Sequence, residues 1–410
     1  MIDLTILRHD PEGTVARIHK KDPTFDGAQL VALDKQVRAL QMQVETVRHK
    51  KNELAQQGKG GVTQALRDAS IALAKELKET EQDLHAVQAQ FQQLYLACPN
   101  LPSDDLPVGF KEANAVVTEW GTVPHFAFTP KNHLELGTAL GWFDFAAAAR
   151  MTGSQFALYK GQGARLVYAL TRLMIEHNQK HGYSLVIPPY LVNEASLIAS
   201  SNFPKFRDQV YQVSEDTLFL TPTAEVNLLN MYRDHIFESA ELPVRMTAWT
   251  SCFRREAGGY GATERGLIRI HQFEKVELFT FCEPTQADAE LERMVTCAQE
   301  LLQMLELSYR ISLLATQDCS FPSARTYDIE VWMPGQNAFY EVSSCSNCTD
   351  FQARRAAVRY RASAGSKPTL AYTLNGSSLA LPRLMVALLE NYQQPDGSVR
   401  IPDILKQYGA

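Results

Sequence analysis

The chain has 410 residues, a formal net charge of −6, 45% hydrophobic residues and 21% charged residues. These values are typical of a globular protein with room for two domains, and the acidic total argues weakly against a protein that coats nucleic acid. The sequence has no apolar run of about 18 residues and no signal-peptide or organelle-import pattern at its N-terminus, so we expect no membrane anchor. Seven cysteines are few for this length, which favours reduced thiols and a cytoplasmic protein.

Two long segments near the N-terminus carry hydrophobic residues at alternating steps of three and four. The stripes comprise Leu30, Leu33, Val37, Leu40, Val44, Val47 and Leu54, then Leu66, Leu73, Leu77, Leu84, Val87, Phe91, Leu94 and Cys98. Glycine-rich residues 58–61 separate them, which predicts an antiparallel pair of helices that projects as an arm. Taken alone, such an arm is typical of a dimerisation or spacer hairpin. Its basic residues are also compatible with phosphate contact, and they are Arg38, Arg48, Lys50, Lys51 and Lys59.

Prolines at 99, 102 and 107 end the second helix and mark a linker. Beyond about residue 120, helical and β-rich segments mix without regular βαβ alternation, which predicts an antiparallel sheet flanked by helices. We therefore expect an α+β protein with a coiled-coil arm over residues 1–105 and a second domain over 106–410. Within that domain, residues 163–180 are predicted as a helix and 185–189 as a strand.

A short apolar strand, 218–220, leads into Thr221-Pro222-Thr223-Ala224-Glu225. Thr223 and Glu225 suit the first turn of a helix, where a hydroxyl caps the helix and a carboxylate meets its positive end. A hydroxyl and a carboxylate at a strand end also suit the binding of an ammonium group. The two interpretations are compatible.

The segment 252–273 predicts a strand, a glycine-rich turn and a returning strand. Arg254 can bind a phosphate through two parallel hydrogen bonds, while Phe273 offers a flat face and Glu256 an acceptor to a nucleobase. Strand alternation puts Phe273, Lys275 and Glu277 on one face. Because the sequence lacks both G-x-x-x-x-G-K-[ST] and G-x-G-x-x-G after a strand, this hairpin is the predicted ATP site.

Two later segments complete the candidate site. Glu341 and Ser344 follow an aromatic strand, and their oxygens suit a Mg²⁺ ion that also binds ATP phosphates, although a half-exposed strand has the same pattern. Gly376 is expected to let the backbone approach a ligand, and Arg383 precedes an apolar helix that ends near Tyr392.

Cys345 and Cys348 form a C-x-x-C motif beside these residues. A structural zinc needs two further ligands, and the remaining candidates, Cys319 and His271, are scattered. The segment also lacks the βαβ setting of a redox motif. We therefore expect no zinc and no disulfide.

The predicted hairpin, about 250–277, resembles motif 2 of the class II aminoacyl-tRNA synthetases. Within that class, its sequence resembles that of the seryl-tRNA synthetases in particular. Residues 163–189 resemble motif 1 and residues 373–392 resemble motif 3, while the N-terminal arm resembles the tRNA-binding arm of the family. The resemblance covers nearly the whole chain and favours the bacterial-type, zinc-free branch. Pro382 departs from the family, which usually has glycine there.

The resemblance implies a homodimeric serine–tRNA ligase that forms seryl-adenylate from L-serine and ATP with Mg²⁺. The seryl group then passes to tRNA(Ser), and to tRNA(Sec) where the host has it. The catalytic candidates are Arg254 and Arg383. The implied serine-binding residues are Thr223, Ala224, Glu225, Glu277 and Ser377. The implied ATP-binding residues are Arg254, Arg255, Glu256, Phe273, Glu341, Val342, Ser343, Ser344 and Arg383, with Mg²⁺ held by Glu341 and Ser344.

Two other functions fit parts of this pattern. A non-catalytic RNA-binding relative would be expected to lose motif residues, yet the motif residues are present. An enzyme that loads an amino acid onto a carrier protein would lack the long arm, which this sequence has.

Overall fold

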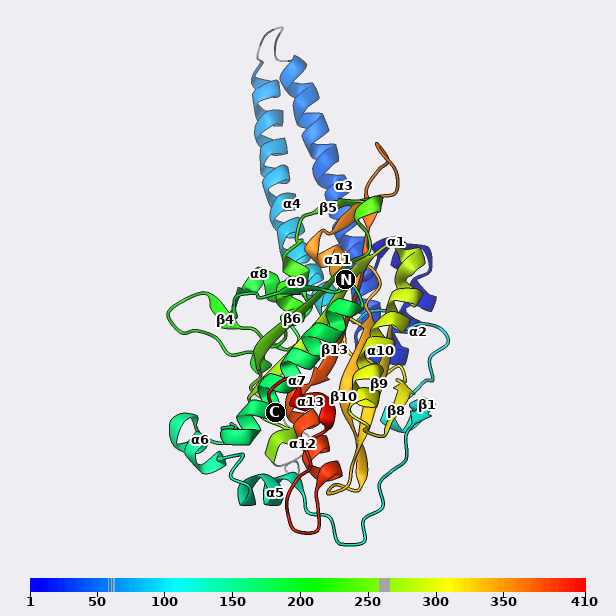
Figure 1. Cartoon of the computed structure of the whole chain (residues 1–410). Coiled ribbons are helices and arrows are strands. Elements are labelled where there is room, and N and C mark those ends of the chain that lie inside the picture. Colours follow the sequence, from blue (N-terminus) through cyan, green and yellow to red (C-terminus); the bar gives the residue numbers. More distant parts are fainter. Residues whose placement is uncertain (58, 60, 62, 258–265) are drawn as a thin grey trace. The chain divides into compact units, whose positions relative to one another are not determined.

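The computed structural model describes residues 1–57, 59, 61, 63–257 and 266–410 (Figure 1). Contacts divide the chain into two compact units, Asp3–Pro99 and Asn100–Ala410. The predicted tip glycines at 58 and 60 and the predicted turn at 258–265 lie outside the described residues.

The first unit is helical. Its helices in the described ranges are α1 (Leu4–His9), α2 (Pro11–Lys21), α3 (Gly27–Gln57) and α4 (Gln64–Ala97). Helices α3 and α4 pack side by side and run in opposite directions, so the predicted helical hairpin is confirmed. The first stripe supplies buried side chains along this contact, including Leu33, Val37, Val44 and Val47.

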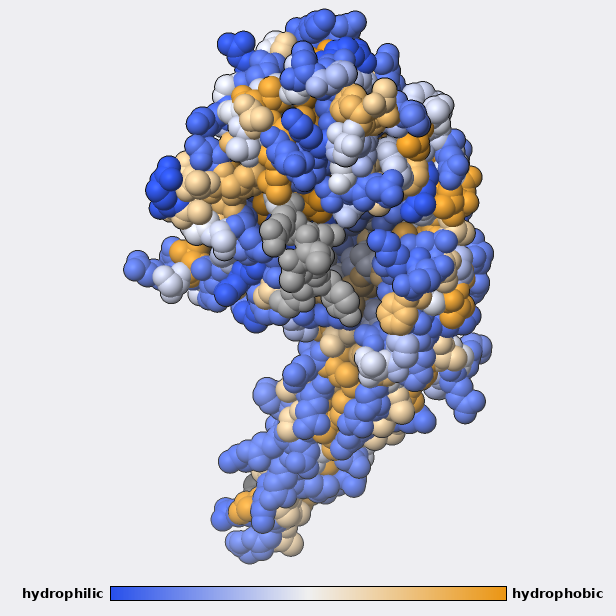
Figure 2. Space-filling model, turned by 90° about the horizontal axis from the view of Figure 1, so that it is seen from below, coloured by the Kyte–Doolittle hydropathy of each residue, from blue (hydrophilic) through white to orange (hydrophobic). Residues whose placement is uncertain are grey.

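Charged residues of the arm are partly paired within it. Asp34 accepts hydrogen bonds from Arg8 at 2.7 Å and from Arg38 at 3.0 Å. Arg48 of α3 reaches Glu81 of α4 at 2.7 Å, which links the two helices. Hydrophilic residues dominate the visible surface of the arm in Figure 2. A single buried seam with a polar exterior is what the heptad pattern predicts.

The second unit is built on a mixed but mainly antiparallel sheet. Its strand order is β1 (Ala115–Trp120), β8 (Tyr309–Leu313), β9 (Arg325–Met333), β10 (Ala338–Asn347), β13 (Tyr372–Ala380), β7 (Gln272–Cys282), β6 (Val244–Phe253) and β2 (Ser184–Val186). All these neighbours pair antiparallel except β2 and β6. Shorter strands form small sheets, and they are β3 (Leu191–Asn193) with β4 (Leu218–Leu220), and β5 (Ile236–Glu238), β11 (Arg359–Arg361) and β12 (Thr369–Leu370).

Helices cover both faces of this sheet. One face packs against α7 (Gly161–Lys180), α10 (Ala287–Met304) and α12 (Leu381–Tyr392). The strands also contact α9 (Ala224–Asn230) and α11 (Phe351–Ala356). The remaining helices of the described residues are α5 (His133–Ala139), α6 (Phe145–Thr152), α8 (Glu194–Ala199) and α13 (Asp403–Lys406). The predicted antiparallel sheet with flanking helices is therefore confirmed.

Strand alternation separates a core face from a polar face in the centre of the sheet. Val276 and Leu278 of β7 are fully buried in apolar clusters that include α7, α10 and α12. Lys275 and Glu277 point to the other side, because successive residues of a strand face opposite ways. This alternation is what brings polar side chains of distant segments together.

The structure sets where the paired strands of the predicted hairpin end. The ladder of β6 and β7 ends at Phe253 and Gln272, so Arg254 follows one strand and Arg269 precedes the other. Past that point the backbone N–H of Arg255 bonds to the carbonyl of Gln209 at 2.8 Å instead of to the hairpin partner. The Arg254 N–H still bonds to the His271 carbonyl at 2.9 Å, so the contact with Gln209 begins at Arg255.

The structure gives local reasons for Pro382 and Gly376. Pro382 lies in the first turn of α12, where a missing N–H leaves no hydrogen bond unmade, so it is compatible with the helix start. At Gly376, an added Cβ would lie 2.7 Å from Met294 Sδ and 2.9 Å from Cys345 Sγ. The glycine therefore makes room for α10 against the sheet, and the approach of a ligand to its backbone stays a prediction.

Among the helices of the described chain, none combines the length and apolar character needed to cross a bilayer.

Candidate functional site

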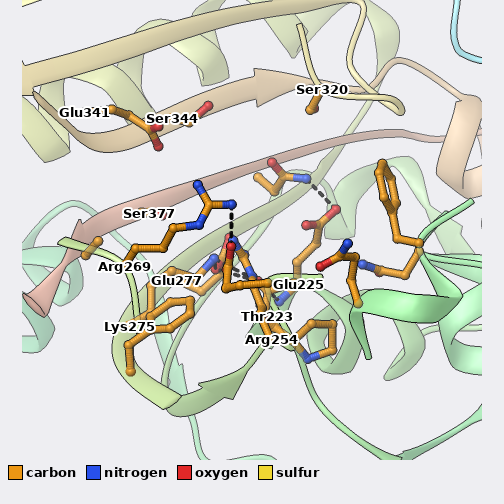
Figure 3. Close-up of a pocket in the computed structure, with 18 of the residues that line it drawn as sticks. Thr223, Glu225, Arg254, Arg269, Lys275, Glu277, Ser320, Glu341, Ser344 and Ser377 are labelled. Carbon is orange, nitrogen blue, oxygen red and sulfur yellow. Dashed lines mark hydrogen bonds and ion pairs between the residues drawn. The ribbon is translucent and has the colours of Figure 1, made fainter. Parts of the chain in front are cut away.

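A cavity of about 700 Å³ opens over the polar side of the sheet. Most of the residues predicted for the site line it, and these are Thr223, Glu225, Arg254, Glu256, Phe273, Glu277, Glu341, Ser344, Ser377 and Arg383. Figure 3 shows Glu341 and Ser344 on one strand, across the cavity from Thr223 and Arg254. The predicted residues that share this pocket are therefore separated by up to 160 positions in the sequence, from Thr223 to Arg383.

Thr223 joins the start of α9 to strand β7. Its hydroxyl caps α9 by accepting from the Glu225 N–H at 3.3 Å, and it donates to Glu277 Oε2 at 3.0 Å. Lys275 Nζ bonds to the same hydroxyl at 2.8 Å and forms an ion pair with Glu277. Glu277 is only 2% exposed, so this pairing satisfies a carboxylate that has almost no access to water.

Glu225 is held by two amides. Gln352 Nε2 donates to Glu225 Oε1 at 2.5 Å and Asn375 Nδ2 donates to the same oxygen at 2.6 Å. Burial, followed by the charge of Glu277, raises the pKa of the Glu225 carboxyl to about 7. A cationic partner that enters beside this carboxyl, such as an ammonium group, stabilises its ionised form.

The other end of the cavity holds arginines and an aromatic ring. The guanidinium carbon of Arg254 lies 5.2 Å from the centre of the Phe273 ring, and its Nε donates to the Pro222 carbonyl at 3.2 Å. Arg269 forms an ion pair with Glu256 at 2.5 Å. Two guanidinium groups beside a flat ring suit a nucleotide phosphate and its base.

Arg383 and Glu341 face one another on the third side. The Nη1 atom of Arg383 donates to the Glu341 carbonyl at 2.8 Å and lies 3.3 Å from the Glu341 carboxylate. The first turn of α12 therefore presents a guanidinium next to the acidic group of β10.

Asp328 of β9 lies opposite Ser344 in the sheet and hydrogen-bonds with it. Burial and the nearby charge of Glu341 hold the pKa of Asp328 well above its usual range. Its buried Oδ1 has no hydrogen-bond partner in the described part of the chain. An unsatisfied carboxylate oxygen beside Glu341 and Ser344 is the chemistry expected around a Mg²⁺ ion, so these residues fit that ion.

Four predicted residues do not line the cavity. Ala224 and Val342 are buried in apolar clusters. The Ser343 hydroxyl donates to the Ser377 carbonyl at 2.5 Å. The Arg255 guanidinium carbon lies 5.9 Å from the centre of the Tyr211 ring, outside the cavity. Each is a sequence neighbour of a lining residue, and its side chain points to a different side of the chain.

The cavity also contains polar residues that the sequence analysis left out of the site. They include Arg269, Lys275 and Asn375, with Gln352 behind Glu225 and Asp328 behind Ser344. Residues two positions apart on a strand face the same side of a sheet. Lys275 is two positions from Glu277 and Asn375 is two positions from Ser377, so this spacing could have identified both. Nothing in the local sequence of Gln352 or Asp328 indicates the contact, because their partners come from other elements.

The C-x-x-C motif lies at the end of β10. Cys345 and Cys348 are both buried, and burial raises the pKa of the Cys345 thiol to about 12. A thiol with this pKa is a poor nucleophile at neutral pH, and the absence of zinc and disulfide at this motif stays a prediction.

Two family models match the chain. Residues 1–102 match the seryl-tRNA synthetase N-terminal domain, and residues 208–392 match the tRNA synthetase class II core domain (G, H, P, S and T). The two matches fall in the helical unit and in the unit that holds the cavity.

Full-length relatives agree with these matches. The chain is 46% identical to a serine–tRNA ligase of Acidithiobacillus ferrooxidans and 44% identical to one of Nitratidesulfovibrio vulgaris, in each case over 100% of this chain and 98% of the relative. Among solved structures, it is similar to seryl-tRNA synthetase from Pyrococcus horikoshii complexed with ATP, with a TM-score of 0.93 and 33% identity over 100% of this chain and 98% of the other.

Proposed function

The chain belongs to the serine–tRNA ligase family of class II aminoacyl-tRNA synthetases, and on that basis we propose how its pocket and arm divide the reaction. It is an ATP-dependent ligase that joins serine to tRNA. L-Serine and ATP react first to give seryl-adenylate and pyrophosphate, and the seryl group then passes to the 3′ end of tRNA(Ser).

The deep end of the pocket binds serine. Glu225 receives the ammonium group, because it is a buried carboxylate on which the described side-chain amides donate to one oxygen, Oε1. Glu277 accepts from the serine hydroxyl, and Thr223 and Ser377 border the same space. A pocket that hydrogen-bonds a hydroxyl rejects alanine by about 10⁴ or more, since its polar groups would be left unpaired. Threonine has to be excluded by the shape of the pocket.

The arginine-lined end binds ATP. Arg254 contacts the phosphate that is attacked, Phe273 supports the adenine ring, and Glu256 accepts from its amino group. Arg383 holds the far phosphates from the first turn of α12. The guanidinium carbon of Arg254 lies 5.2 Å from the centre of the Phe273 ring, which supports a binding mode in which one nucleotide contacts both residues.

Glu341 and Ser344 would hold Mg²⁺ together with ATP phosphates. When bound, the ion supplies positive charge that neutralises the phosphates. The unsatisfied oxygen of Asp328 beside Ser344 supports this assignment.

No general base is needed for the first step. The serine carboxylate is the nucleophile, and Arg254 and Arg383 stabilise the charge that develops on the phosphate as pyrophosphate leaves. Binding both substrates in one pocket also removes most of the entropy cost of bringing them together. Positioning and charge neutralisation by this chain therefore account for the chemistry.

The helical arm binds tRNA. Arg38 and Arg48 are engaged in ion pairs within the arm, whereas Lys50 and Lys59 are exposed toward its distal end. Exposed lysines near the tip favour contact with the phosphate backbone. We expect tRNA(Ser) as the partner, tRNA(Sec) where the host has it, and a cytoplasmic homodimer.

The observation that carries this proposal is that one cavity joins Thr223, Glu225 and Glu277 to Arg254 and Arg383. The test is ATP–pyrophosphate exchange with a panel of amino acids, followed by aminoacylation of purified tRNA(Ser). Serine alone is expected to drive exchange. Exchange driven by another amino acid, or by none, would contradict the proposal and favour a non-catalytic relative. Transfer to a carrier protein in place of tRNA would favour the carrier-loading alternative.

A further inference from the structure

Helices α7 and α10 bring two histidines, a cysteine and a carboxylate together away from the cavity. His177 lies in the last turn of α7 and His181, four residues later, is the C-cap of that helix, while Cys297 and Glu300 are three residues apart on α10. Both spacings put side chains on one face of a helix. Because α7 and α10 pack against each other, the two pairs meet.

The donor atoms converge closely. One ligand atom from each of His177, His181 and Cys297 lies within 4.8 Å of the others, and among the described residues this is the one such group of histidine, cysteine or carboxylate side chains. Glu300 Oε2 lies 2.8 Å from His181 Nε2 and 3.4 Å from His177 Nε2.

This cluster is separate from the serine and ATP site. Asn178, next to His177, accepts from the Cys297 thiol at 3.3 Å and from the Ser378 hydroxyl at 2.8 Å. Ser378 and the pocket residue Ser377 are neighbours on β13 and face opposite sides of the sheet. The cluster therefore lies behind the floor of the pocket, on the side covered by helices.

The hydrogen bonds within this cluster share acceptor atoms. His177 Nε2 is 3.1 Å from the Cys297 carbonyl, while Glu300 serves both histidines with one oxygen. His177 and Cys297 are buried and Glu300 is partly exposed, which leaves a route to solvent on one side. Two imidazoles, a thiolate and a carboxylate are a ligand set that zinc accepts in tetrahedral sites.

We propose that His177, His181 and Cys297, with Glu300 as the fourth ligand, bind one divalent transition-metal ion of the zinc class. The proton of the Cys297 thiol leaves to solvent on binding, and the metal replaces the hydrogen bond that the thiol makes to Asn178. The ion clamps α7 to α10 behind the pocket floor. This departs from the sequence-based expectation of no zinc, which considered the C-x-x-C motif and missed a pairing of residues 120 positions apart.

The test uses Co²⁺ as a spectroscopic probe of the full-length protein after removal of bound metal with a chelator. We expect about one Co²⁺ per chain, with the visible spectrum of a tetrahedral site, a thiolate charge-transfer band, and displacement by Zn²⁺. Cys297→Ser should abolish the thiolate band. His181→Ala should weaken Co²⁺ binding by at least about 100-fold. The His181 ring is partly exposed, so its removal tests the site without opening the core.

Two controls localise the site. Cys282→Ser removes another buried thiol from the same apolar cluster and should keep the band. Cys345→Ser with Cys348→Ser should also keep it. The proposal is overturned if wild-type protein shows no thiolate band, if the band survives both Cys297→Ser and His181→Ala, or if it disappears in the C-x-x-C variant. Each readout is independent of serine activation, so failure here leaves the proposed ligase function unaffected.

Discussion

Buried charges in the pocket are balanced by one another instead of by water. Glu277 is 2% exposed and is paired with Lys275, whose side chain is also buried. Removing one partner of such a pair leaves an uncompensated charge, which costs more than the pair itself contributes. Single substitutions at these residues therefore need controls that separate lost substrate contact from lost charge balance.

Glu277→Gln should impair serine use more than ATP use. A hydrogen bond to a charged acceptor contributes roughly 1.5–3 kcal/mol, so kcat/KM for serine should fall about 10- to 150-fold in pyrophosphate exchange. Discrimination against alanine should fall too, because alanine never makes the bond. Glu274→Gln is the matched control, since Glu274 is a second glutamate of β7 that lies outside the cavity lining and accepts a hydrogen bond from Ser251. An unchanged ratio of serine to alanine use would falsify the assignment of Glu277 to the serine side chain.

Glu225 should make serine binding dependent on pH near neutrality. Its pKa is raised to about 7, so the carboxyl takes up a proton as the pH falls through that value. The protonated form has no charge to pair with the serine ammonium group, and KM for serine should therefore rise about 10-fold between about pH 8 and about pH 6. KM for ATP over the same range is the control. Glu225→Gln should bind serine weakly without this dependence; a wild-type KM that is flat with pH would contradict the prediction.

Arg254→Ala and Arg383→Ala should each slow adenylate formation by on the order of 10²-fold or more, as expected on losing a preorganised positive charge. The reason is that both guanidinium groups face the cavity where phosphate charge develops. Pre-steady-state formation of adenylate measures the effect. Arg255→Ala is the matched control, because that side chain lies against Tyr211 outside the cavity. Near-normal kinetics in either pocket variant would remove that arginine from the ATP site.

At the scale of elements, strand β7 and helix α12 do most of the positioning. Alternation along β7 points Lys275 and Glu277 into the cavity while Val276 is buried in the core. The start of α12 aims Arg383 at Glu341, and Pro382 in the first turn does not disturb it. The core packing of these elements therefore sets the geometry of the polar residues beside it.

Removing the arm should separate the two steps of the reaction. Replacing Gln29–Ala97 with a short linker should spare pyrophosphate exchange and abolish aminoacylation. The cavity residues all lie at or beyond Ser200, so the arm contributes none of them in the described chain. Circular dichroism and thermal unfolding check that the truncated protein is folded. Equal loss of exchange and aminoacylation in a folded truncation would contradict this division.

At the scale of the whole molecule, the edge strand β2 and its surroundings remain open to a second copy. Tyr168, Leu185, Ile187 and Leu191 are exposed apolar side chains in or beside the segment that resembles motif 1, and Ile187 is 82% exposed. An exposed sheet edge with apolar residues is a surface that proteins normally cover.

We therefore expect a dimer in sedimentation equilibrium. Tyr168→Asp combined with Ile187→Asp should convert it to a monomer, because two charges would have to be buried in the interface. Met42→Asp, which alters an exposed apolar residue on the arm, is the control and should stay dimeric. A wild-type monomer, or a dimer that persists in the double variant, would contradict the proposed interface.

The arm and much of the site could be predicted from local patterns. The heptad spacing indicated α3 and α4, and a period of two along β7 put Phe273, Lys275 and Glu277 on one face. These features follow from the regular period with which side chains change direction along one helix or one strand, and that period is visible in the sequence. The extent of the hairpin was not predictable in the same way, because contact with Gln209 ends it.

The sequence by itself determined the family, the two-unit organisation and the identities of the residues that face ATP and serine in the proposal. Only the tertiary structure decided that Gln352 and Asn375 hold Glu225, that Gly376 accommodates Met294, and that Cys297 meets His177 and His181. The physical reason is the same in each case. These contacts join elements far apart in the chain, so no local spacing encodes them, and they exist only once the helices have packed on the sheet.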